Sequence, residues 1–488
     1  MSNKYNIEEN INIIINELNN NSELIIKRFL IGIKNPIDVA IIYINGLVNS
    51  DLINRDILNP LMIEIREDLS EILYLSDYLC KKYICISDAQ IEEDVRKVVN
   101  QIKNGKTVLI INQCKDYILM DTKGGMYRQI SDAQNESSIR GPRESFIENF
   151  EVNISLIKRR IKDKNLIIEK TVVGKRTKSN IAIIYIKDIA DSNIVEYIKE
   201  RIAAIDIDSI AASGTLGQLI ENHTYSIFPQ FYITERVDVI QSNILEGKIA
   251  IILEGATQVI SAPSLFIDFF QAVEDYYERF IVASFSRIIR LVCAFIVITL
   301  PSLYLSAIKY NLEIIPVNFV VPILRSRIGI SLSPFFEIIL MELVIEVLRE
   351  GGLRLPNKIG QTLSVVGGII IGQMAVEAKV VSPDTLLIVG IGAVCTFVIP
   401  NYEMTISIRL LRFPMLIICN LFGLLGIVLF WYVIMVHLLS FDSFGIPYIS
   451  MNPSDMKDIF IRAPVQYLNK RPKDIAAKDK IRQKTSKE

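Results

Sequence analysis

The sequence has little histidine and no excess of charge of either sign. Only His223 and His437 occur among the 488 residues, which argues against a histidine-rich metal site. The 53 basic and 54 acidic side chains nearly cancel, so no overall positive charge favours nucleic-acid binding. The six cysteines form no C-x-x-C pair, which argues against zinc ribbons and thioredoxin-like redox chemistry. We therefore expect no metal, no cofactor and no nucleic-acid partner.

The common catalytic and nucleotide-binding motifs are also missing. The sequence contains no G-x-G-x-x-G, no H-E-x-x-H and no G-x-S-x-G. Gly105-Lys106-Thr107 resembles the end of a P-loop, but Asn100 occupies the position where that motif requires glycine. The sequence therefore predicts a protein that is not an enzyme.

The N-terminal residues lack the features of a secretory signal. Residues 1–21 are rich in asparagine and glutamate and contain no unbroken apolar core. We therefore expect the N-terminal half of the chain to lie in the cytoplasm.

Apolar and charged residues are segregated along the chain. The mean hydropathy of +0.34 is high for an ordinary soluble protein, yet 22% of the residues are charged. Stretches without any formal charge almost vanish before residue 280, and four of them follow: Leu291–Ile308, Gln361–Val376, Thr385–Tyr402 and Phe413–Phe441. This distribution predicts a soluble N-terminal half followed by a membrane-embedded C-terminal half.

The N-terminal half contains an internal repeat at one fixed offset. The run Ala-Ile-Ile-Tyr-Ile occurs within Val39–Ile44 and again within Ile181–Ile186, so that Ala40 corresponds to Ala182. The same offset aligns Gly105-Lys106 and the apolar run after it with Gly247-Lys248 and its apolar run. Because the offset is unchanged over about 75 residues, a duplication is the better explanation.

Each copy of the repeat alternates strands and helices. A β-branched run predicts a buried strand, and a polar–apolar helix, a second helix and a hairpin of two short strands follow it. We expect an α/β soluble half made of two repeated mixed α/β subdomains, each a mixed sheet covered by helices, over residues 1–130 and 131–285, separated by a polar linker at 122–138.

A cluster of basic residues follows the linker. It comprises Arg140, Arg143, Arg159, Arg160, Lys175 and Arg176. Such side chains either contact anionic lipid headgroups or phosphate next to a membrane domain, or form a solvated helix face and an interdomain network of ion pairs. The sequence leaves both interpretations open.

We expect an all-α polytopic membrane domain over residues 286–445. The predicted spans are Leu291–Ile308, Leu363–Val376, Leu386–Ile399 and Phe413–Leu439. Arg287 and Arg290 place the start of the first span on the inside, and Arg409 and Arg412 precede the last span. Residues 446–488 are expected to form a basic tail on the cytoplasmic side, disordered over Lys457–Glu488, so an even number of crossings is simplest.

The segment Pro334–Gly351 is apolar over most of its length but carries five charged residues. At about 100° per residue, Glu342, Glu346, Arg349 and Glu350 share one stripe and Glu337 points the other way. Carboxylates inside a membrane are costly unless they face water, a partner or a transport pathway. In a ring of several chains each glutamate would be repeated, and acidic rings attract cations. Gln373 and Glu377 are secondary candidates for lining such a pore.

A second interpretation of this segment is an amphipathic helix at the inner membrane interface. Its acidic face would then lie in water or against the soluble half. Whether Pro334–Gly351 spans the membrane, re-enters it or lies at the interface stays open from the sequence.

Several motifs give the chain a resemblance to the A subunits of bacterial spore germinant receptors, the GerA family. In the soluble half they are Arg140–Phe146 (RGPRESF), Leu156–Lys162 (LIKRRIK), Val173–Lys178 (VGKRTK), Ile205–Asp208, Pro229-Gln230, Thr234–Arg236 and Glu274–Arg279 (EDYYER). In the membrane half they are Gly352–Pro356, Ile359–Gln361, Pro400–Glu403, Leu410–Pro414 and Phe444–Tyr448 (FGIPY). The family's usual glycine after Arg-Glu is Ser145 here.

The resemblance implies a function that the residues alone do not. Such A subunits act with B and C subunits in the inner membrane of dormant spores, and they are thought to form a homo-oligomeric ring that releases monovalent cations. It implies a ligand-gated cation channel subunit that triggers spore germination. The alternative is a non-conducting scaffold that couples a nutrient-sensing partner to a separate channel.

Overall fold

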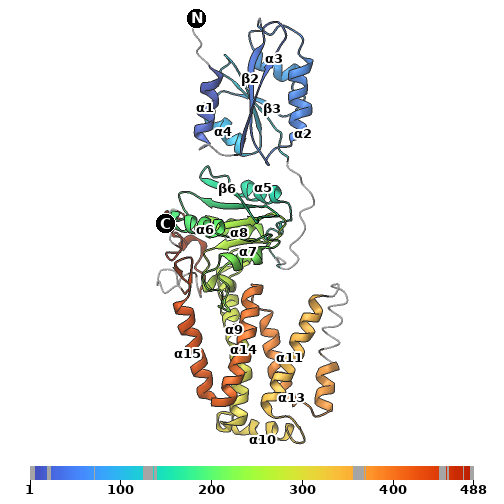
Figure 1. Ribbon diagram of the computed structural model, residues 1–488, viewed down its shortest axis with the longest axis vertical. Helices are drawn as coiled ribbons and strands as arrows, with labels where there is room; N and C mark the ends of the chain where they lie inside the picture. Colours follow the sequence, from blue (N-terminus) through green and yellow to red (C-terminus); the bar gives the residue numbers. More distant parts are fainter. Residues whose placement is uncertain are drawn as a thin grey trace. The chain divides into compact units, whose positions relative to one another are not determined.

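The computed structural model describes residues 6–18, 23–70, 72–124, 136, 140–354, 368, 370–449, 458, 461–475 and 477–483. The chain divides into two compact units. The first, here the α/β unit, comprises Met1–Ile220, Ile233–Ala262 and Ile475–Lys480. The second, here the helical unit, comprises Glu221–Tyr232, Pro263–Asp474 and Ile481–Glu488. Figure 1 shows the strands in blue to green and the bundle of long helices in yellow to red.

The first sheet has the order β1-β2-β4-β5-β3. Its strands are β1 (Leu24–Ile31), β2 (Ile37–Ile44), β3 (Ala89–Glu92), β4 (Thr107–Ile111) and β5 (Tyr117–Met120). The helices that cover it are α1 (Ile7–Glu17), α2 (Ser50–Leu52), α3 (Leu75–Lys82) and α4 (Val95–Lys103), with π-helical turns at Ile53–Leu58 and Pro60–Glu64.

Helices cover both faces of this sheet. Ala40 and Ile42 of β2 pack with α1 and α4, whereas Val39 and Ile41 pack with α3 and the π-helical turns. Successive side chains of a strand point to opposite faces, so a strand that is buried on both faces needs apolar residues at every position. The continuous β-branched run of the sequence therefore corresponds to a central strand between two helical layers.

The second sheet repeats the first, in the order β6-β7-β9-β10-β8. Its strands are β6 (Leu166–Val173), β7 (Ser179–Ile186), β8 (Tyr232–Thr234), β9 (Ile249–Leu253) and β10 (Val259–Ala262). Its helices are α5 (Phe150–Arg160), α6 (Ser192–Ala203), α7 (Ser213–Ile220) and α8 (Val237–Glu246), and α5 and α8 pack on one face. The starts of β6, β7, β9 and β10 follow those of β1, β2, β4 and β5 at the same offset that the repeat shows in the sequence.

The expectation of a mixed sheet is wrong for the first copy, because its four strand pairs are all antiparallel. The alternation of strands and helices favoured a mixed sheet, in which some neighbouring strands are parallel. Instead the chain passes from β2 through helices to β3 at the far edge, and α4 returns it to β4 beside β2. The short edge strand β3, whose four residues Ala89–Glu92 carry no clear strand pattern, decides this topology.

Glycines at equivalent positions open the central hairpin of each copy. Gly105 has a φ of +87° and Gly247 a φ of +104°, in the left-handed region that favours glycine. A Cβ atom at Gly105 would lie 2.8 Å from the Leu47 carbonyl oxygen, and one at Gly247 would lie 3.2 Å from Ala477 Cβ. Gly105-Lys106 and Gly247-Lys248 are therefore turns that lead into β4 and β9, not phosphate-binding loops.

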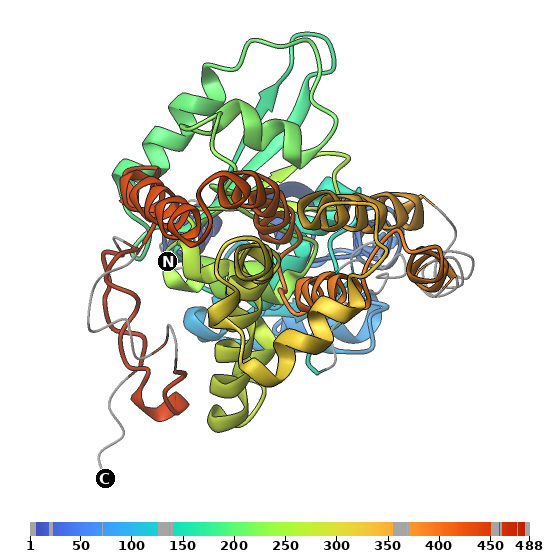
Figure 2. The same cartoon turned by 90° about the horizontal axis from the view of Figure 1, so that it is seen from below.

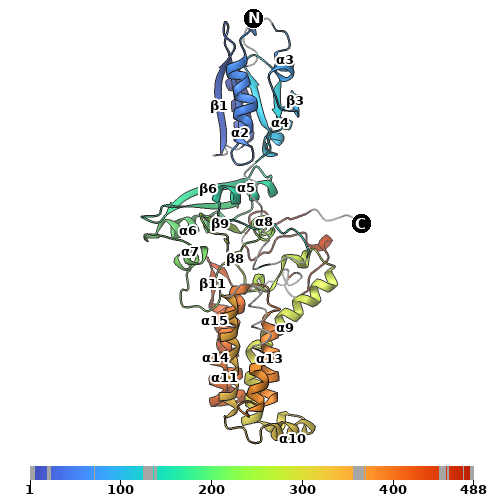
Figure 3. The ribbon, with the colours of Figure 1, turned by 90° about the vertical axis from the view of Figure 1, so that its right-hand side faces the viewer.

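The helical unit contains α9 (Phe280–Lys309), α10 (Val317–Ser326), α11 (Pro334–Leu353), α13 (Pro383–Thr396), α14 (Tyr402–Phe422) and α15 (Leu424–Ser440). Short 3-10 helices occur at Phe266–Phe270, Val273–Tyr276, Leu312–Ile314 and Val465–Tyr467, and β11 (Asp442–Ser443) pairs with β12 (Ile446–Pro447). Among the described residues, α9 and α14 are long and apolar enough to cross a membrane, and α10, α13 and α15 are shorter apolar helices. Figure 3 shows α9, α11, α13, α14 and α15 running along one another within this unit.

The predicted single span Phe413–Leu439 is wrong, because two helices occupy it. α14 ends at Phe422 and α15 begins at Leu424, with Gly423 between them at a φ of +60°. A Cβ atom at Gly426 would lie 2.6 Å from the Ile418 carbonyl oxygen, so the two helices approach closely at this turn. The residues on both sides of this turn are apolar. The sequence therefore shows one continuous apolar stretch with no break at Gly423. Arg409 and Arg412 lie inside α14, not before a span.

The other predicted segments have different outcomes. Leu291–Ile308 lies within α9, and Leu386–Ile399 overlaps α13. Residues 363–367 and 369 of the predicted span Leu363–Val376 lie outside the described residues, and residues 370–377 are helical. The linker at 122–138 also lies largely outside them.

The expectation of a disordered tail is wrong for part of it. Ala477 packs in the core beneath α5 and α8, and the Lys478 amide donates to the Ile189 carbonyl at 2.8 Å. An apolar alanine and isoleucine within the basic sequence provide this attachment, since Ile475 and Ala477 are both buried.

Candidate functional site

Two glutamates of α11 and two arginines of α14 form a cluster of ion pairs. Arg412 Nη1 lies 2.6 Å from Glu342 Oε2, and Arg412 Nη2 lies 3.0 Å from Glu346 Oε1. Arg409 Nη2 lies 2.8 Å from Glu346 Oε2, and its Nε donates to Glu346 Oε1 at 3.1 Å. We call these four residues the α11–α14 cluster. Its formal charges cancel.

The spacing of these residues explains why they meet. Glu342 and Glu346 are four residues apart and Arg409 and Arg412 are three apart, so each pair shares one helix face. The side chains of Glu342 and Arg412 are fully buried. Withdrawing a charge from water costs several kcal/mol, and the opposite charge offsets this cost only while the helices stay together. The carboxylates of the cluster are therefore neutralised only while α11 packs against α14.

Glu337 lies on the other side of α11, as predicted, and it too is fully buried. Its Oε1 lies 2.6 Å from Arg327 Nη2. Its Oε2 accepts hydrogen bonds from the Ser382 amide at 3.1 Å and the Thr385 hydroxyl at 3.2 Å. Ser382 caps the N-terminus of α13, where a negative charge is favourable. This carboxylate therefore joins α11 to the start of α13.

The remaining predicted pore residues do not join the cluster. Arg349 donates to the Thr396 hydroxyl at 3.3 Å, and the exposed Glu350 pairs with Arg354 one helical turn later. Gln373 and Glu377 are exposed and line a mainly apolar cavity of about 900 Å³ together with residues of α13. Which of these side chains face a conducting pathway stays a prediction.

Several of the predicted basic residues have acidic partners within the α/β unit. Arg160 Nη2 lies 2.6 Å from Glu144 Oε2, and Lys175 Nζ lies 2.5 Å from Asp206 Oδ1. Arg176 faces Asp208 at 3.9 Å. Arg140 and Arg143 are exposed, and Arg159 is half-buried. The motifs Val173–Lys178 and Ile205–Asp208 thus meet each other in the fold. Contact of these bases with a membrane stays a prediction.

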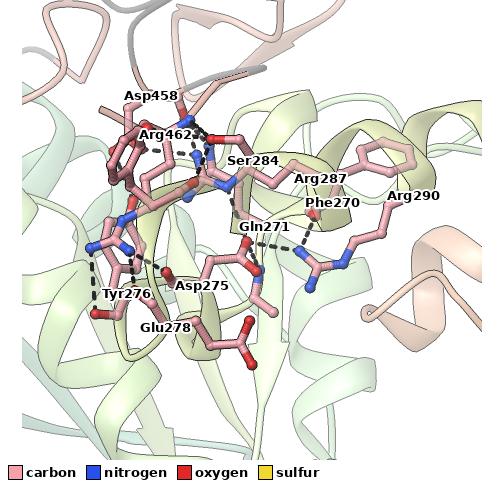
Figure 4. A network of polar contacts seen from close by, with 12 residues as sticks. Phe270, Gln271, Asp275, Tyr276, Glu278, Ser284, Arg287, Arg290, Asp458 and Arg462 are labelled. Carbon is pink, nitrogen blue, oxygen red and sulfur yellow. Dashed lines mark hydrogen bonds and ion pairs between the residues drawn. The ribbon is translucent and has the colours of Figure 1, made fainter. Parts of the chain in front are cut away.

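A second ion-pair network, which no pattern in the sequence indicated, fixes the start of α9 (Figure 4). Asp275 Oδ2 lies 3.0 Å from Arg287 Nε and 2.8 Å from Arg290 Nη1. Arg287 Nη1 also pairs with Asp458 at 2.9 Å. Arg462 Nη1 donates to the carbonyls of Asp275 at 2.6 Å and Glu278 at 2.8 Å. Arg287, interpreted as a marker of membrane orientation, therefore also binds Asp458 in the C-terminal part of the chain, whereas Arg290 contacts Asp275.

The segment Glu221–Tyr232 makes a third polar network within the helical unit. His223 Nε2 lies 2.8 Å from Asp442 Oδ1, and His437 Nε2 lies 3.1 Å from the Ser226 hydroxyl. Tyr448 donates to the Pro229 carbonyl at 2.7 Å. The motifs Pro229-Gln230 and Phe444–Tyr448, which are distant in the sequence, are therefore in contact. In the sequence, His223 and His437 stand out only because histidine is scarce.

Comparisons with known proteins agree with the resemblance found in the sequence. The family model described as Bacillus/Clostridium GerA spore germination protein matches residues 12–474. The chain is 37% identical over 471 residues to "Spore germination protein KA" of Bacillus subtilis (strain 168), covering 96% of this chain and 86% of that protein. It is 35% identical over 471 residues to the "Uncharacterized membrane protein YfkQ" of the same strain, covering 96% and 91%.

A solved structure is also similar to part of the chain. It is the N-terminal domain of the A subunit of the Bacillus megaterium spore germinant receptor GerK3, with 30% identity and a TM-score of 0.41. The match covers 55% of this chain and 98% of that one. Since the family model spans nearly the whole sequence, the chain belongs to the GerA family of spore germination proteins.

Proposed function

We propose that this chain is the A subunit of a nutrient germinant receptor that forms a ring and conducts monovalent cations to trigger germination. The helical unit would be embedded, as a polytopic domain, in the inner membrane of the spore, with the α/β unit in the cytoplasm. The family membership and the relative named as a membrane protein support this assignment. B and C subunits would be its partners, and no catalytic role is proposed.

The α11–α14 cluster is the observation that carries the channel proposal. Glu342 and Glu346 lie on an otherwise apolar helix, and arginines of a candidate membrane span neutralise both. Carboxylates on an otherwise apolar membrane helix are rare and commonly mark the pathway of an ion or a proton. Separation of α11 from α14 would leave the carboxylates needing water or cations as new partners, and a ring of them would attract cations. The paired arrangement then corresponds to a closed state.

A matched pair of substitutions tests this proposal. Glu346→Gln removes a carboxylate of the cluster, whereas Glu350→Gln on the same helix removes an exposed carboxylate that, among the described residues, pairs with Arg354 one turn later. We expect Glu346→Gln, alone and with Glu342→Gln, to change potassium flux through reconstituted vesicles and potassium release from spores. Glu350→Gln should leave both close to wild type if the α11–α14 cluster, rather than the whole predicted acidic stripe, controls the flux. Equal flux in all variants at equal protein levels would refute the role of the cluster in conduction.

The burial of Glu342 supports a second candidate function. Because its carboxylate is fully buried and paired in the single chain, α11 also suits a non-conducting scaffold that relays a signal from a partner to a separate channel. In that case the purified protein should give no conductance in vesicles at any protein density. Cluster variants should still impair germination, since they would disturb the relay. Chemical crosslinking that shows only monomers would favour this candidate over the ring.

A further inference from the structure

The short helix α10 presents an apolar stripe that no part of the described chain covers. None of the ten residues Val317–Ser326 is buried. Val317, Val321, Leu324 and Ile328, which follows the helix end, have exposed fractions of 81%, 52%, 46% and 72%. At about 100° per residue these four side chains fall within a stripe about 60° wide. The exposed residues Asn318 and Arg325 flank the stripe on one side.

The C-terminal end of α10 is attached to the rest of the helical unit. The Ser326 hydroxyl donates to Asp384 Oδ2 near the start of α13, and Arg327 pairs with the buried Glu337 of α11 at 2.6 Å. Ser326 lies roughly opposite the apolar stripe around the helix. These contacts attach α10 through Ser326 and Arg327, so the stripe lies on the side away from Ser326, and Phe319 on the Ser326 side is a further exposed apolar residue (61%).

The neighbouring helix ends place α10 at the level where the spans terminate. α9 ends at Lys309, whose Nζ donates to the Asn420 side chain at 2.7 Å, and the Tyr310 hydroxyl donates to the Asn420 carbonyl at 2.6 Å. Gly423 turns α14 into α15 at the same end. Lysine and tyrosine are typical of the membrane–water interface. Figures 1 and 2 show α10 lying across this end of the helical unit, where it follows α9 after a short connection.

We infer that α10 is an interfacial helix that seats its apolar stripe in the boundary between the headgroups and acyl chains of the membrane. The inference rests on the proposed membrane location of the helical unit. A lipid surface fits this stripe for two reasons. The helix lies at the end of the bundle where α9 ends, and the exposed Arg325 beside the stripe is suited to anionic headgroups. Together with its anchors on Glu337 and Asp384, α10 would fix the depth of α11 and α13 in the bilayer.

The single tryptophan of the chain makes this inference testable by fluorescence quenching. Trp431→Phe provides a tryptophan-free background, into which Val317→Trp or Val321→Trp introduces a probe on the stripe. Asn318→Trp places a matched probe on the polar flank, and Phe295→Trp places a reference probe on an exposed position in the middle of α9. The full-length proteins are reconstituted into phosphatidylcholine–phosphatidylglycerol vesicles whose lipids carry bromine either near the headgroup or near the end of the acyl chain.

We expect the stripe probes to lose more fluorescence with shallow bromine than with deep bromine, and more than the Asn318→Trp probe. The Phe295→Trp probe should be quenched most by deep bromine. Quenching at position 295 without quenching at 317 and 321 would overturn the inference and indicate that protein, for example a second copy of the chain, covers the stripe. Stronger quenching of the stripe by deep bromine, or equal quenching at 318, would also overturn it. Absence of quenching at every position, including 295, would instead refute the membrane location itself.

Discussion

Arg412 of α14 and Glu342 of α11 form an ion pair with an Nη1–Oε2 distance of 2.6 Å, and both side chains are fully buried. The two residues belong to helices that are not consecutive in the chain. Each would be costly to bury alone, so the pair makes the packing of these two helices depend on electrostatics as well as on apolar contact. Arg412 also contacts Glu346, which gives the guanidinium two acidic partners on α11.

Breaking this pair should destabilise the helical unit strongly. Arg412→Gln leaves the buried Glu342 without its opposite charge, and we expect a loss of about 3–5 kcal/mol in stability. The double variant Arg412→Gln, Glu342→Gln should recover part of that loss, because it removes the uncompensated charge. Thermal unfolding of the detergent-solubilised protein measures both effects. Losses that simply add in the double variant would contradict a direct interaction.

Glu67 should make the stability of the first α/β copy depend on pH under acidic conditions. Hydrogen bonds from Tyr83, Tyr78 and Lys82 lower the pKa of its carboxyl from 4.5 to about 2. A lowered folded-state pKa contributes stability above the unfolded value, and this contribution disappears as the pH falls from about 4.5 towards 2. Glu67→Gln should reduce the melting temperature at neutral pH and flatten its dependence on pH in that window. A variant with the same acid dependence as wild type would refute this role.

Gly247→Ala should destabilise the packing of Ile475–Lys480 within the α/β unit. The substitution strains a backbone with positive φ and brings a methyl group to 3.2 Å from Ala477 Cβ. We expect a cost of more than about 1 kcal/mol. Gly255→Ala is the matched control, because Gly255 also has a positive φ (+80°) but no atom lies within 4 Å of the added Cβ. If both variants lost the same stability, the contact with Ala477 would contribute nothing.

Arg462 should hold its own part of the chain against the start of α9. Its guanidinium donates to the carbonyls of Asp275 and Glu278, and its amide donates to the Ser284 hydroxyl at 3.0 Å. Arg462→Met keeps the bulk of the side chain but leaves these carbonyls without a donor, at a cost of about 1–3 kcal/mol. We expect faster amide hydrogen exchange and faster proteolysis around residue 462, with little change in the β-strands. Unchanged exchange there would show that apolar packing alone retains the segment.

Much of the architecture follows from local patterns in the sequence. The segregation of charge separates the α/β and helical regions, because side chains of each kind favour different surroundings over whole segments. The constant offset between Ala40 and Ala182 and their neighbours predicted the repeat, since duplicated sequence folds into equivalent strands and helices. The sequence motifs also indicated the family before any tertiary contact was considered.

The tertiary structure alone decided how distant segments meet. Period and composition report the face of a helix or strand, but not its partner, so the antiparallel place of β3 and the reversal at Gly423 were missed. In the same way, helical spacing placed Glu342 and Glu346 on one stripe, whereas only the fold brought Arg409 and Arg412 against it. Charges on separate helices carry no mark of their pairing in the sequence, because the Coulomb energy depends on distances that packing sets.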